Sequence, residues 1–413
     1  MSSGSLDSRL APLHRLWRIL PARQRRALLW RATAMLAPRP RHPAPPAREG
    51  MWVAGELSRA SGLGEVARLM LKGLDQLGVA SWQIDLAHAI GAPSDLPAVP
   101  TTRPPPGVPL LLHVNAPQVP LALLRLPRAL LRNRQLIGYW AWELPVVPSL
   151  WNGGASFVHE AWVLSRFTAA AVEPLLPGRV RVVPPPLAAA PPVASALDRA
   201  AFGLPEKAVV ILVSFNLASS FQRKNPLGVV AAFRAAFGNR GDRLLLLKIG
   251  NPADFPDNFR VLREAVADAP NIRLDTRTLP AADRHALTRA ADIVLSLHRS
   301  EGFGLVPAEA MLLGRPVIAT GWSGNMEYMD AESARLVAYR LVPARDPRGV
   351  FEAPDAVWAE PDQRDTIASL RSLADDPELR ASLGERGRLA AERRLGLGPL
   401  AEALRALGLA PAQ

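Results

Sequence analysis

The sequence predicts an α/β protein with two domains of similar design. In each half of the chain, short apolar runs typical of buried strands alternate with helical segments. A proline- and alanine-rich stretch, 188–196, separates the two series and predicts a linker. The 413 residues are enough for two domains of ordinary size, which we place at 49–190 and 191–413.

In the first domain, apolar runs that end in polar or turn residues predict the buried strands. These runs cover 51–55, 82–86, 109–115, 135–142, 161–164 and 179–183. In open α/β sheets, ligands bind beyond the carboxyl ends of the strands. The residues at these ends are therefore candidates for a ligand-binding cleft: His113, Asn115, Trp140, Trp142 and Glu143.

A small-residue loop, 58–64, leads from the first strand into a helix and fits a dinucleotide-binding fingerprint. Gly62, Gly64 and Ala67 have the spacing G-x-G-x-x-A, and Asp85 follows at about the distance of a ribose-binding carboxylate. This pattern predicts an NAD-dependent oxidoreductase as an alternative. Against it, several residues separate the strand from Gly62, whereas the fingerprint has its glycines at the turn itself.

The second domain continues the same alternation of strands and helices. Its predicted strands are 208–215, 243–250, 271–275, 291–297 and 316–320, its main helices are 227–237 and 282–290, and further helices form a tail. Arg223 and Lys224 stand at the entrance of the first of these helices. Two cations at that point would neutralise a diphosphate group.

The stretch 296–327 carries the strongest functional pattern. A polar, glycine-bearing loop, 298–304, is followed by a short helix with Pro307 in its first turn and Gly314 just past its end. Such a loop directs free backbone N–H groups and a positive helix end to one point, which favours phosphate. Two carboxylates, Glu301 and Glu309, frame that point.

This stretch resembles the signature of the retaining GT-B glycosyltransferases of family 4, the group 1 type. The residues that match are Glu301, Gly302, Phe303, Gly304, Leu305, Pro307, Glu309, Ala310, Gly314, Pro316 and Val317. The resemblance covers about residues 51–395 and implies the GT-B fold, two Rossmann-like domains facing a cleft. It also implies that the last helix returns to the first domain.

The resemblance further implies roles for individual residues in binding the donor. Glu301 would face the donor sugar, Glu309 would bind the ribose hydroxyls, and Lys224 matches the family's lysine. The backbone amides of Gly302, Phe303, Gly304, Leu305 and Val306 would hold the diphosphate, and the Gly62 and Gly64 loop would face the cleft.

Two positions depart from the family pattern. The family's arginine near Ala218 or Ser219 is missing, so Arg223 is expected to take its part. The family's histidine after a first-domain strand is replaced by Trp-Ala-Trp-Glu, so Glu143 becomes a catalytic candidate. His113, Asn115 and Trp142 remain the candidates for acceptor or sugar contacts.

The expected activity is the transfer of a hexose of mannose or glucose type from a nucleotide diphosphate sugar, with retention. The acceptor would be a glycan or a lipid-linked molecule, in bacterial surface polysaccharide synthesis. No metal and no cofactor are expected. Alternatives are a GT-B epimerase or phosphorylase, the oxidoreductase named above, and a non-catalytic membrane-associated sugar-binding protein.

Residues 1–48 form a basic extension that ends in a proline-rich linker. Ten arginines against one aspartate give it a net charge of +9, out of +12 for the whole chain. Leucines, tryptophans and a methionine among the arginines of 10–36 predict one or two basic amphipathic helices, split near Pro21. Residues 1–45 would then lie on an anionic membrane surface, or form a solvated extension. Nucleic-acid binding is not expected, because no recognition motif accompanies the charge.

Composition limits the cellular setting that the sequence predicts. The chain has no cysteine, which excludes disulfides and thiolate metal sites. Arginines interrupt every apolar run of the extension, so we expect no secretory signal, and no apolar run is long enough to span a bilayer. We therefore expect a cytoplasmic enzyme, peripheral on the inner face of the membrane if the extension binds lipid.

Overall fold

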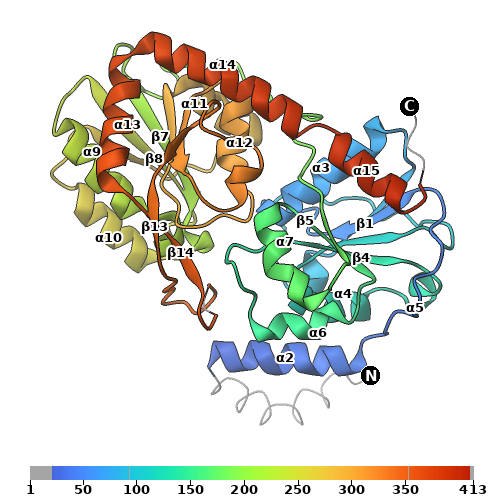
Figure 1. Cartoon of the computed structure of the whole chain (residues 1–413). Coiled ribbons are helices and arrows are strands. Elements are labelled where there is room, and N and C mark those ends of the chain that lie inside the picture. Colours follow the sequence, from blue (N-terminus) through green and yellow to red (C-terminus); the bar gives the residue numbers. More distant parts are fainter. Residues whose placement is uncertain (1–20, 93, 352, 410–413) are drawn as a thin grey trace, which may run out of the picture.

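The computed structural model describes residues 21–92, 94–351 and 353–409. It contains two six-stranded sheets and one two-stranded sheet. The two large sheets, each with its own helices, lie side by side as two halves of the molecule (Figure 1). We call the part around β1–β6 the first half and the part around β7–β12 the second half.

The sheet of the first half is parallel, with the strand order β2-β1-β3-β4-β5-β6. Its strands are β1 (Met51–Gly55), β2 (Ser81–Asp85), β3 (Leu110–His113), β4 (Leu136–Trp140), β5 (Glu160–Val163) and β6 (Val180–Val182). Its helices are α3 (Gly62–Gln76), α4 (Val119–Arg125), α5 (Arg128–Leu131), α6 (Asn152–Ala155) and α7 (Arg166–Val172). Strands β1, β3 and β4 are buried along their whole length, which explains their continuous apolar sequences.

The sheet of the second half is also parallel, with the order β12-β11-β10-β7-β8-β9. Its strands are β7 (Val209–Asn216), β8 (Arg243–Gly250), β9 (Ile272–Asp275), β10 (Ile293–Ser296), β11 (Val317–Thr320) and β12 (Arg335–Val337). Its helices are α8 (Phe221–Lys224), α9 (Pro226–Phe237), α10 (Pro256–Val266), α11 (Ala281–Ala290) and α12 (Leu305–Leu312).

The strand order of each sheet reverses direction at one place. In the first half the reversal lies between β1 and β3, and in the second half it lies between β7 and β10. Ligands of open α/β sheets bind at such a switch point, beyond the carboxyl ends of the two strands. After β7 the chain carries Arg223 and Lys224 on α8, and after β10 it carries Glu301 in the loop before α12.

The C-terminal helices connect the two halves. They are α13 (Gln363–Asp375), α14 (Pro377–Arg394) and α15 (Gly398–Ala406), and α14 runs from the second half toward the first (Figure 1). Helix α15 packs against α3, where a Cβ on Gly73 would lie 2.9 Å from Leu400 Cδ2. Because Gly73 has no side chain, α15 can pack closely against α3 of the first half.

An antiparallel hairpin, formed by β13 (Tyr339–Pro343) and β14 (Val357–Pro361), follows the second sheet. It extends toward the first half and α2 in Figure 1. Buried residues of the hairpin, including Phe351 and Trp358, belong to one apolar cluster with Trp140, Trp142 and Trp151 of the first half. Trp140 is fully buried in that cluster, so it serves the core rather than the edge of a binding site.

The described part of the N-terminal extension begins with α2 (Ala22–Leu36), directly after Pro21. It packs against α4 and α6 of the first half. Its exposed large apolar side chains are Leu28, Leu29, Met35 and Leu36. The predictions for residues 1–20 lie outside the described residues. Over the ranges that the structure describes, no helix is both long and apolar enough to cross a membrane.

Candidate active site

The phosphate-binding loop predicted from the sequence lies between β10 and α12. Gly304 precedes the helix with a left-handed φ of +89°, and a Cβ there would lie 2.9 Å from the Tyr328 hydroxyl oxygen. That hydroxyl donates to the Gly304 carbonyl at 2.5 Å, so the chain needs glycine at this position. Among the described residues, no side chain caps α12. The first-turn N–H groups of this helix can therefore bind an anion.

Next to this loop, three charged side chains meet in the interior. The Lys224 ammonium donates to Glu301 Oε1, and Arg223 Nη1 donates to Glu301 Oε2 at 3.1 Å. Arg223 also donates to the carbonyls of Ser219 and Ser300. Arg223 is 2% exposed and Glu301 is 7% exposed. The buried carboxylate of Glu301, in the loop that leads to α12, thus compensates two cations.

A fourth charged residue, Glu143, reaches this group from the first half. Its Oε1 lies 3.9 Å from Arg223 Nη2, and its backbone carbonyl accepts a hydrogen bond from Ser300 Oγ. We call Arg223, Lys224, Glu301 and Glu143 the charged cluster. The two departures from the family pattern, Arg223 and Glu143, thus lie beside the matched residues Lys224 and Glu301.

Burial and mutual attraction determine the protonation of the charged cluster. Burial alone would raise the pKa of the Glu301 carboxyl, but Lys224 and Arg223 outweigh this and lower that pKa to about 2. Burial raises the pKa of the Glu143 carboxyl and lowers the pKa of the Lys224 ammonium. Glu301 is therefore a carboxylate at neutral pH.

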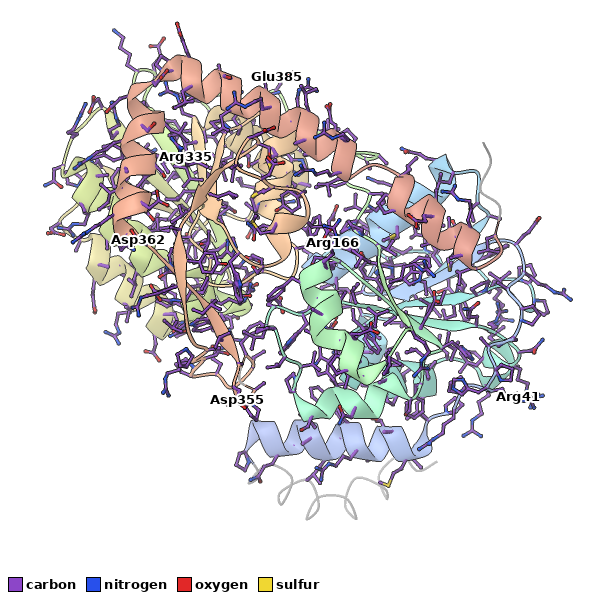
Figure 2. The ribbon with its side chains drawn as sticks, viewed as in Figure 1. Arg41, Arg166, Arg335, Asp355, Asp362 and Glu385 are labelled. Carbon is purple, nitrogen blue, oxygen red and sulfur yellow. The ribbon has the colours of Figure 1, made fainter. Side chains whose placement is uncertain are left out.

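Polar contacts that the sequence did not predict join the two halves beside the charged cluster. Ser165 Oγ donates to the Gly302 carbonyl at 2.7 Å, and the Arg166 backbone N–H donates to Glu327 at 2.8 Å. Arg166 begins α7 and lies between the halves in Figure 2. The sequence could have predicted Ser165 as an N-cap, because it lies between a strand and a helix. It could not have predicted the hydrogen bond of Ser165 to the other half.

Trp142 and Gly302 form a further contact between the halves. A Cβ on Gly302 would lie 2.9 Å from the Trp142 carbonyl oxygen, so the close approach requires glycine. Trp142 is 6% exposed and its indole N–H donates to the Val146 carbonyl at 2.8 Å. Phe303 is buried against Tyr328, with ring centroids 5.0 Å apart, so only its backbone can contribute to an anion site.

The glycines of the first-half loop lie at the start of α3. A Cβ on Gly62 would be 3.9 Å from Leu305, the first residue of α12, so this loop faces the phosphate-binding loop. A Cβ on Gly64 would lie 2.5 Å from the Glu56 carbonyl oxygen. Gly64 therefore allows α3 to pack closely against the loop before it. Residues 56–61 lie between β1 and α3, so the glycines are not in the turn directly after the strand, where a dinucleotide fingerprint requires them.

The remaining predicted site residues occupy three different settings. Glu309 lies on α12 with its carboxylate 3.7 Å from His285 Nε2. Asn115 accepts a hydrogen bond from the Ala141 backbone at 2.9 Å and so links the ends of β3 and β4. His113 is fully buried and stacks on Tyr139 at 4.4 Å, and burial lowers its pKa to about 3. The structure does not bring His113 to the charged cluster.

His298 and Asn325 form hydrogen bonds that connect the loop 298–304 to the segment after β11. His298 Nε2 lies 3.0 Å from Asn325 Oδ1, and the Asn325 amide donates to the Thr320 carbonyl at 3.0 Å. Burial lowers the pKa of His298. Arg299, the other basic residue of this loop, binds Glu360 at 2.7 Å and thus lies outside the charged cluster.

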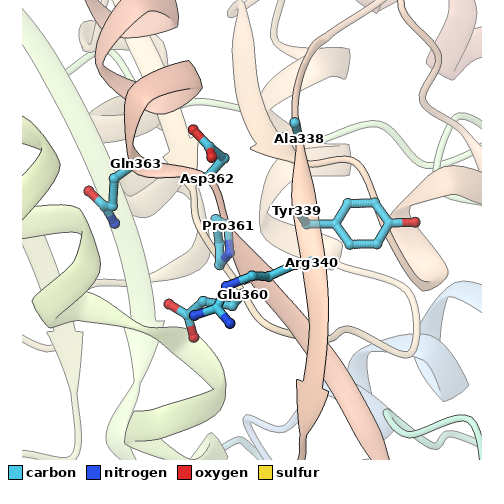
Figure 3. Close-up of a pocket in the computed structure, with 7 residues that line it drawn as sticks. All are labelled: Ala338, Tyr339, Arg340, Glu360, Pro361, Asp362 and Gln363. Atoms are coloured by element: carbon cyan, nitrogen blue, oxygen red, sulfur yellow. The ribbon is translucent and has the colours of Figure 1, made fainter.

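A separate cavity of about 380 Å³ opens on the hairpin, lined by Ala338, Tyr339, Arg340, Glu360, Pro361, Asp362 and Gln363 (Figure 3). None of these residues belongs to the charged cluster. Among the described residues, no group of three or more histidine, aspartate or glutamate side chains is arranged to hold a metal ion.

Comparison with solved structures identifies the fold as GT-B, the two-domain fold of many glycosyltransferases. The sucrose-phosphate synthase of Thermosynechococcus elongatus matches with a TM-score of 0.63 and 16% identity, over 87% of this chain and 99% of that one. HepE of Anabaena, solved with UDP and glucose, matches with a TM-score of 0.59 and 14% identity, over 87% of this chain and 100% of that one. The predicted fold class is confirmed.

Sequence comparison finds similarity to glycosyltransferases in the second half. Residues 209–359 match the family described as "Glycosyl transferases group 1". The D-inositol 3-phosphate glycosyltransferase of Corynebacterium glutamicum is 32% identical over 170 residues, which are 39% of this chain and 35% of that protein. The trehalose synthase of Rubrobacter xylanophilus is 26% identical over 266 residues, 62% of this chain and 55% of that protein. The matched stretches thus span about a third to a half of the curated relatives.

Proposed function

We propose that the protein is a retaining hexosyltransferase of family 4, which uses a nucleotide diphosphate sugar of mannose or glucose type. The observation that carries this proposal is the contact of Glu301 with Lys224 and Arg223. Glu301 lies in the loop before α12, and no side chain of the described residues caps that helix. The acceptor is a glycan or a lipid-linked molecule in bacterial surface polysaccharide synthesis.

The hard step of this reaction is breaking the bond between the anomeric carbon and the diphosphate. Negative charge grows on the leaving phosphate, where Lys224, Arg223 and the α12 N–H groups would stabilise it. Positive charge grows at the anomeric carbon, where the Glu301 carboxylate would stabilise it. The leaving phosphate itself would accept the proton of the acceptor on the same face, which retains the configuration.

The surroundings of the charged cluster support a nucleotide diphosphate as the donor's leaving group. Glu309 lies further along α12, where its carboxylate would bind the ribose hydroxyls. The crystal structure of HepE, which shares the fold, holds UDP and glucose. Because Lys224, Arg223 and α12 supply the positive charge, the proposed reaction uses no metal and no other cofactor.

We also propose that the protein works in the cytoplasm, on the inner face of the membrane. The support is α2, whose exposed leucines and methionine lie near arginines of the extension that are themselves exposed, such as Arg31 and Arg39. Changing Met35 and Leu36 together to glutamate should reduce sedimentation with anionic vesicles, while Leu389→Glu on the exposed face of α14 should not. Equal sedimentation of both variants would contradict the membrane proposal.

Incubation with UDP-, GDP- and ADP-sugars tests the proposed activity. We expect release of the nucleoside diphosphate from one of them, and loss of that release in Glu301→Gln. An epimerase would instead return a different nucleotide sugar, and a phosphorylase would require inorganic phosphate. Release that depends on NAD, or no release from any donor, would contradict the proposal.

A further inference from the structure

The loop at the tip of the hairpin reaches from the second half into the charged cluster. We define the hairpin loop as residues 344–351 and 353–356, which connect β13 and β14. The Ala344 backbone N–H donates to the Ala356 carbonyl at 2.8 Å and closes the loop. Figure 2 labels Asp355, which is next to this closing pair, at the end of the hairpin that points toward the first half. The loop is therefore part of the contact between the halves and not a free surface feature.

Phe351 of the hairpin loop lies between the catalytic candidate Arg223 and the first half. The centre of its ring is 4.9 Å from Arg223 Cζ, and the ring stacks on Trp142 with centroids 5.7 Å apart and planes 28° apart. Phe351 is only 7% exposed. An aromatic face in contact with a buried guanidinium attracts it more strongly than one in water. Phe351 therefore fixes one face of the Arg223 side chain.

Asp346 of the same loop holds the start of α8, the short helix that carries Arg223. Asp346 is fully buried, and its Oδ1 accepts a hydrogen bond from Ser220 Oγ at 3.0 Å. Ser220 has a left-handed φ of +73° and its Oγ caps α8 by accepting the Arg223 backbone N–H at 3.3 Å. Because this backbone conformation is costly for serine, an external contact is needed to maintain it.

Arg348 ties the hairpin loop to the residues that precede α8. Its Nη1 donates to the carbonyls of Leu217 at 3.2 Å and Ala218 at 3.0 Å. The loop thus contacts the chain before α8, the cap of α8 and the guanidinium of Arg223. These contacts surround the place where the resembling family has its arginine, near Ala218 or Ser219, and where this chain has none.

We propose that the hairpin loop positions Arg223 for its work on the donor diphosphate, with Phe351 and Asp346 as positioning residues. This inference rests on the proposed function. Arg223 comes about one helical turn after the family position, so its side chain must return along α8 toward Ser219. The hairpin loop packs against the guanidinium and keeps it between Glu301 and Glu143. The loop positions Arg223 and does not contact the sugar.

A double-mutant cycle separates this role from a general effect on folding. Phe351→Leu should lower kcat about tenfold and leave KM for the donor within about threefold. In the Arg223→Ala background the same change should lower kcat by less than about twofold, because the residue that it positions is gone. Phe351→Tyr keeps the ring and should keep the wild-type kcat. Leu341→Ala, an exposed change on the same hairpin, is the matched control.

A wild-type kcat in Phe351→Leu, or an equal loss with and without Arg223, would overturn the inference. Failure of the proposed function is seen separately, as no turnover by the wild-type protein. The NMR signal of the Arg223 Nε–H, identified by its loss in Arg223→Lys, then decides the inference without any activity. The Phe351 ring lies 4.9 Å from Arg223 Cζ, so a displaced guanidinium should change the shift of this proton. The signal should therefore move in Asp346→Ala, which keeps the ring, but not in Leu341→Ala. An unmoved signal in Asp346→Ala would overturn the inference.

Discussion

Both halves have a strand–loop–helix unit at the switch point, but the N-terminal ends of the two helices differ in their capping. In the first half, Ser61 caps α3 by accepting the Gly64 N–H at 3.1 Å. The Glu56 carboxylate lies below this cap, where it accepts from Ser61 at 2.8 Å and from Arg59 at 3.0 Å. The positive end of α3 is thus already occupied by groups of the chain itself.

In the second half, the N-terminal end of α12, which lies opposite the start of α3, is left open. Within the described residues no side chain caps α12, and Glu301 in the loop before it contacts the cations Lys224 and Arg223. The only carboxylate in contact with both cations is Glu301, again within the described part of the chain. Glycines in a loop therefore do not by themselves predict a phosphate site. We expect the diphosphate at α12, because no side chain of the described residues caps this helix and two cations contact the loop before it.

The largest expected effect concerns the carboxylate of the second half. The lowering of the Glu301 pKa from 4.5 to about 2 corresponds to roughly 3 kcal/mol of stability. A carboxyl whose pKa is lowered by folding stabilises the protein above its unfolded pKa and loses this contribution as the pH falls toward 2. Glu301→Gln should therefore be less stable than wild type at pH 6, with a smaller difference at pH 3. Urea unfolding measures it, and a constant difference would contradict the assignment.

The cations of the second half should matter for the rate. Lys224→Ala should lower kcat about a hundredfold or more, or about 2.7 kcal/mol, the size of one lost electrostatic contact with the transition state. Arg223→Ala should cause a similar loss if Arg223 replaces the family's arginine. Lys72→Ala, an exposed change on α3, is the matched control from the first half. An effect on KM alone would show that Lys224 binds donor and transition state equally.

The carboxylate on α12 should act on nucleotide affinity. Glu309→Gln should weaken nucleotide binding by about 1–3 kcal/mol, the cost of an unmatched buried hydrogen-bonding group. Glu65→Gln in the first turn of α3 is the matching change in the first half and should leave the affinity unchanged. Titration calorimetry with the correct nucleotide measures both. Unchanged affinity in a folded Glu309→Gln protein would rule out the ribose role.

The smallest effect belongs to the closed helix end of the first half. Ser61→Ala removes the cap of α3 and should cost about 1 kcal/mol of stability. Its kcat should stay at the wild-type value, because Ser61 already occupies this helix end and the proposed reaction places the diphosphate at α12. Thermal unfolding and turnover of the same sample test both statements. A large loss of kcat would mean that the first-half loop also takes part in catalysis.

Local patterns of the sequence were sufficient for most of the fold. The strand at Met51–Gly55 and the strand at Arg243–Gly250 have the predicted bounds, because continuous apolar runs between turn residues define buried strands. The sequence also indicated that Arg223, Lys224 and Glu301 belong together, through the resemblance of their loops to one family. Their catalytic and binding roles, like the domain boundaries, stay predictions.

The contacts between the halves could not be predicted in this way. Ser165 contacts Gly302, which is 137 positions away in the sequence. Phe351 contacts Trp142 and Arg223 from a hairpin that was not predicted. Such contacts depend on how two folded bodies pack, which leaves no periodic pattern in either segment. For the same reason His113 is a strand-end residue and still lies buried against Tyr139.

Hydrolysis of the donor without an acceptor tests the central claim most directly, because water then replaces the unknown acceptor. The anomer of the sugar first released from UDP-, GDP- or ADP-sugars is read by NMR, together with the nucleoside diphosphate. We expect one donor to release its sugar with retained configuration, and Lys224→Ala to do so about a hundredfold more slowly. Inverted sugar, or a wild-type rate in Lys224→Ala, would contradict the account.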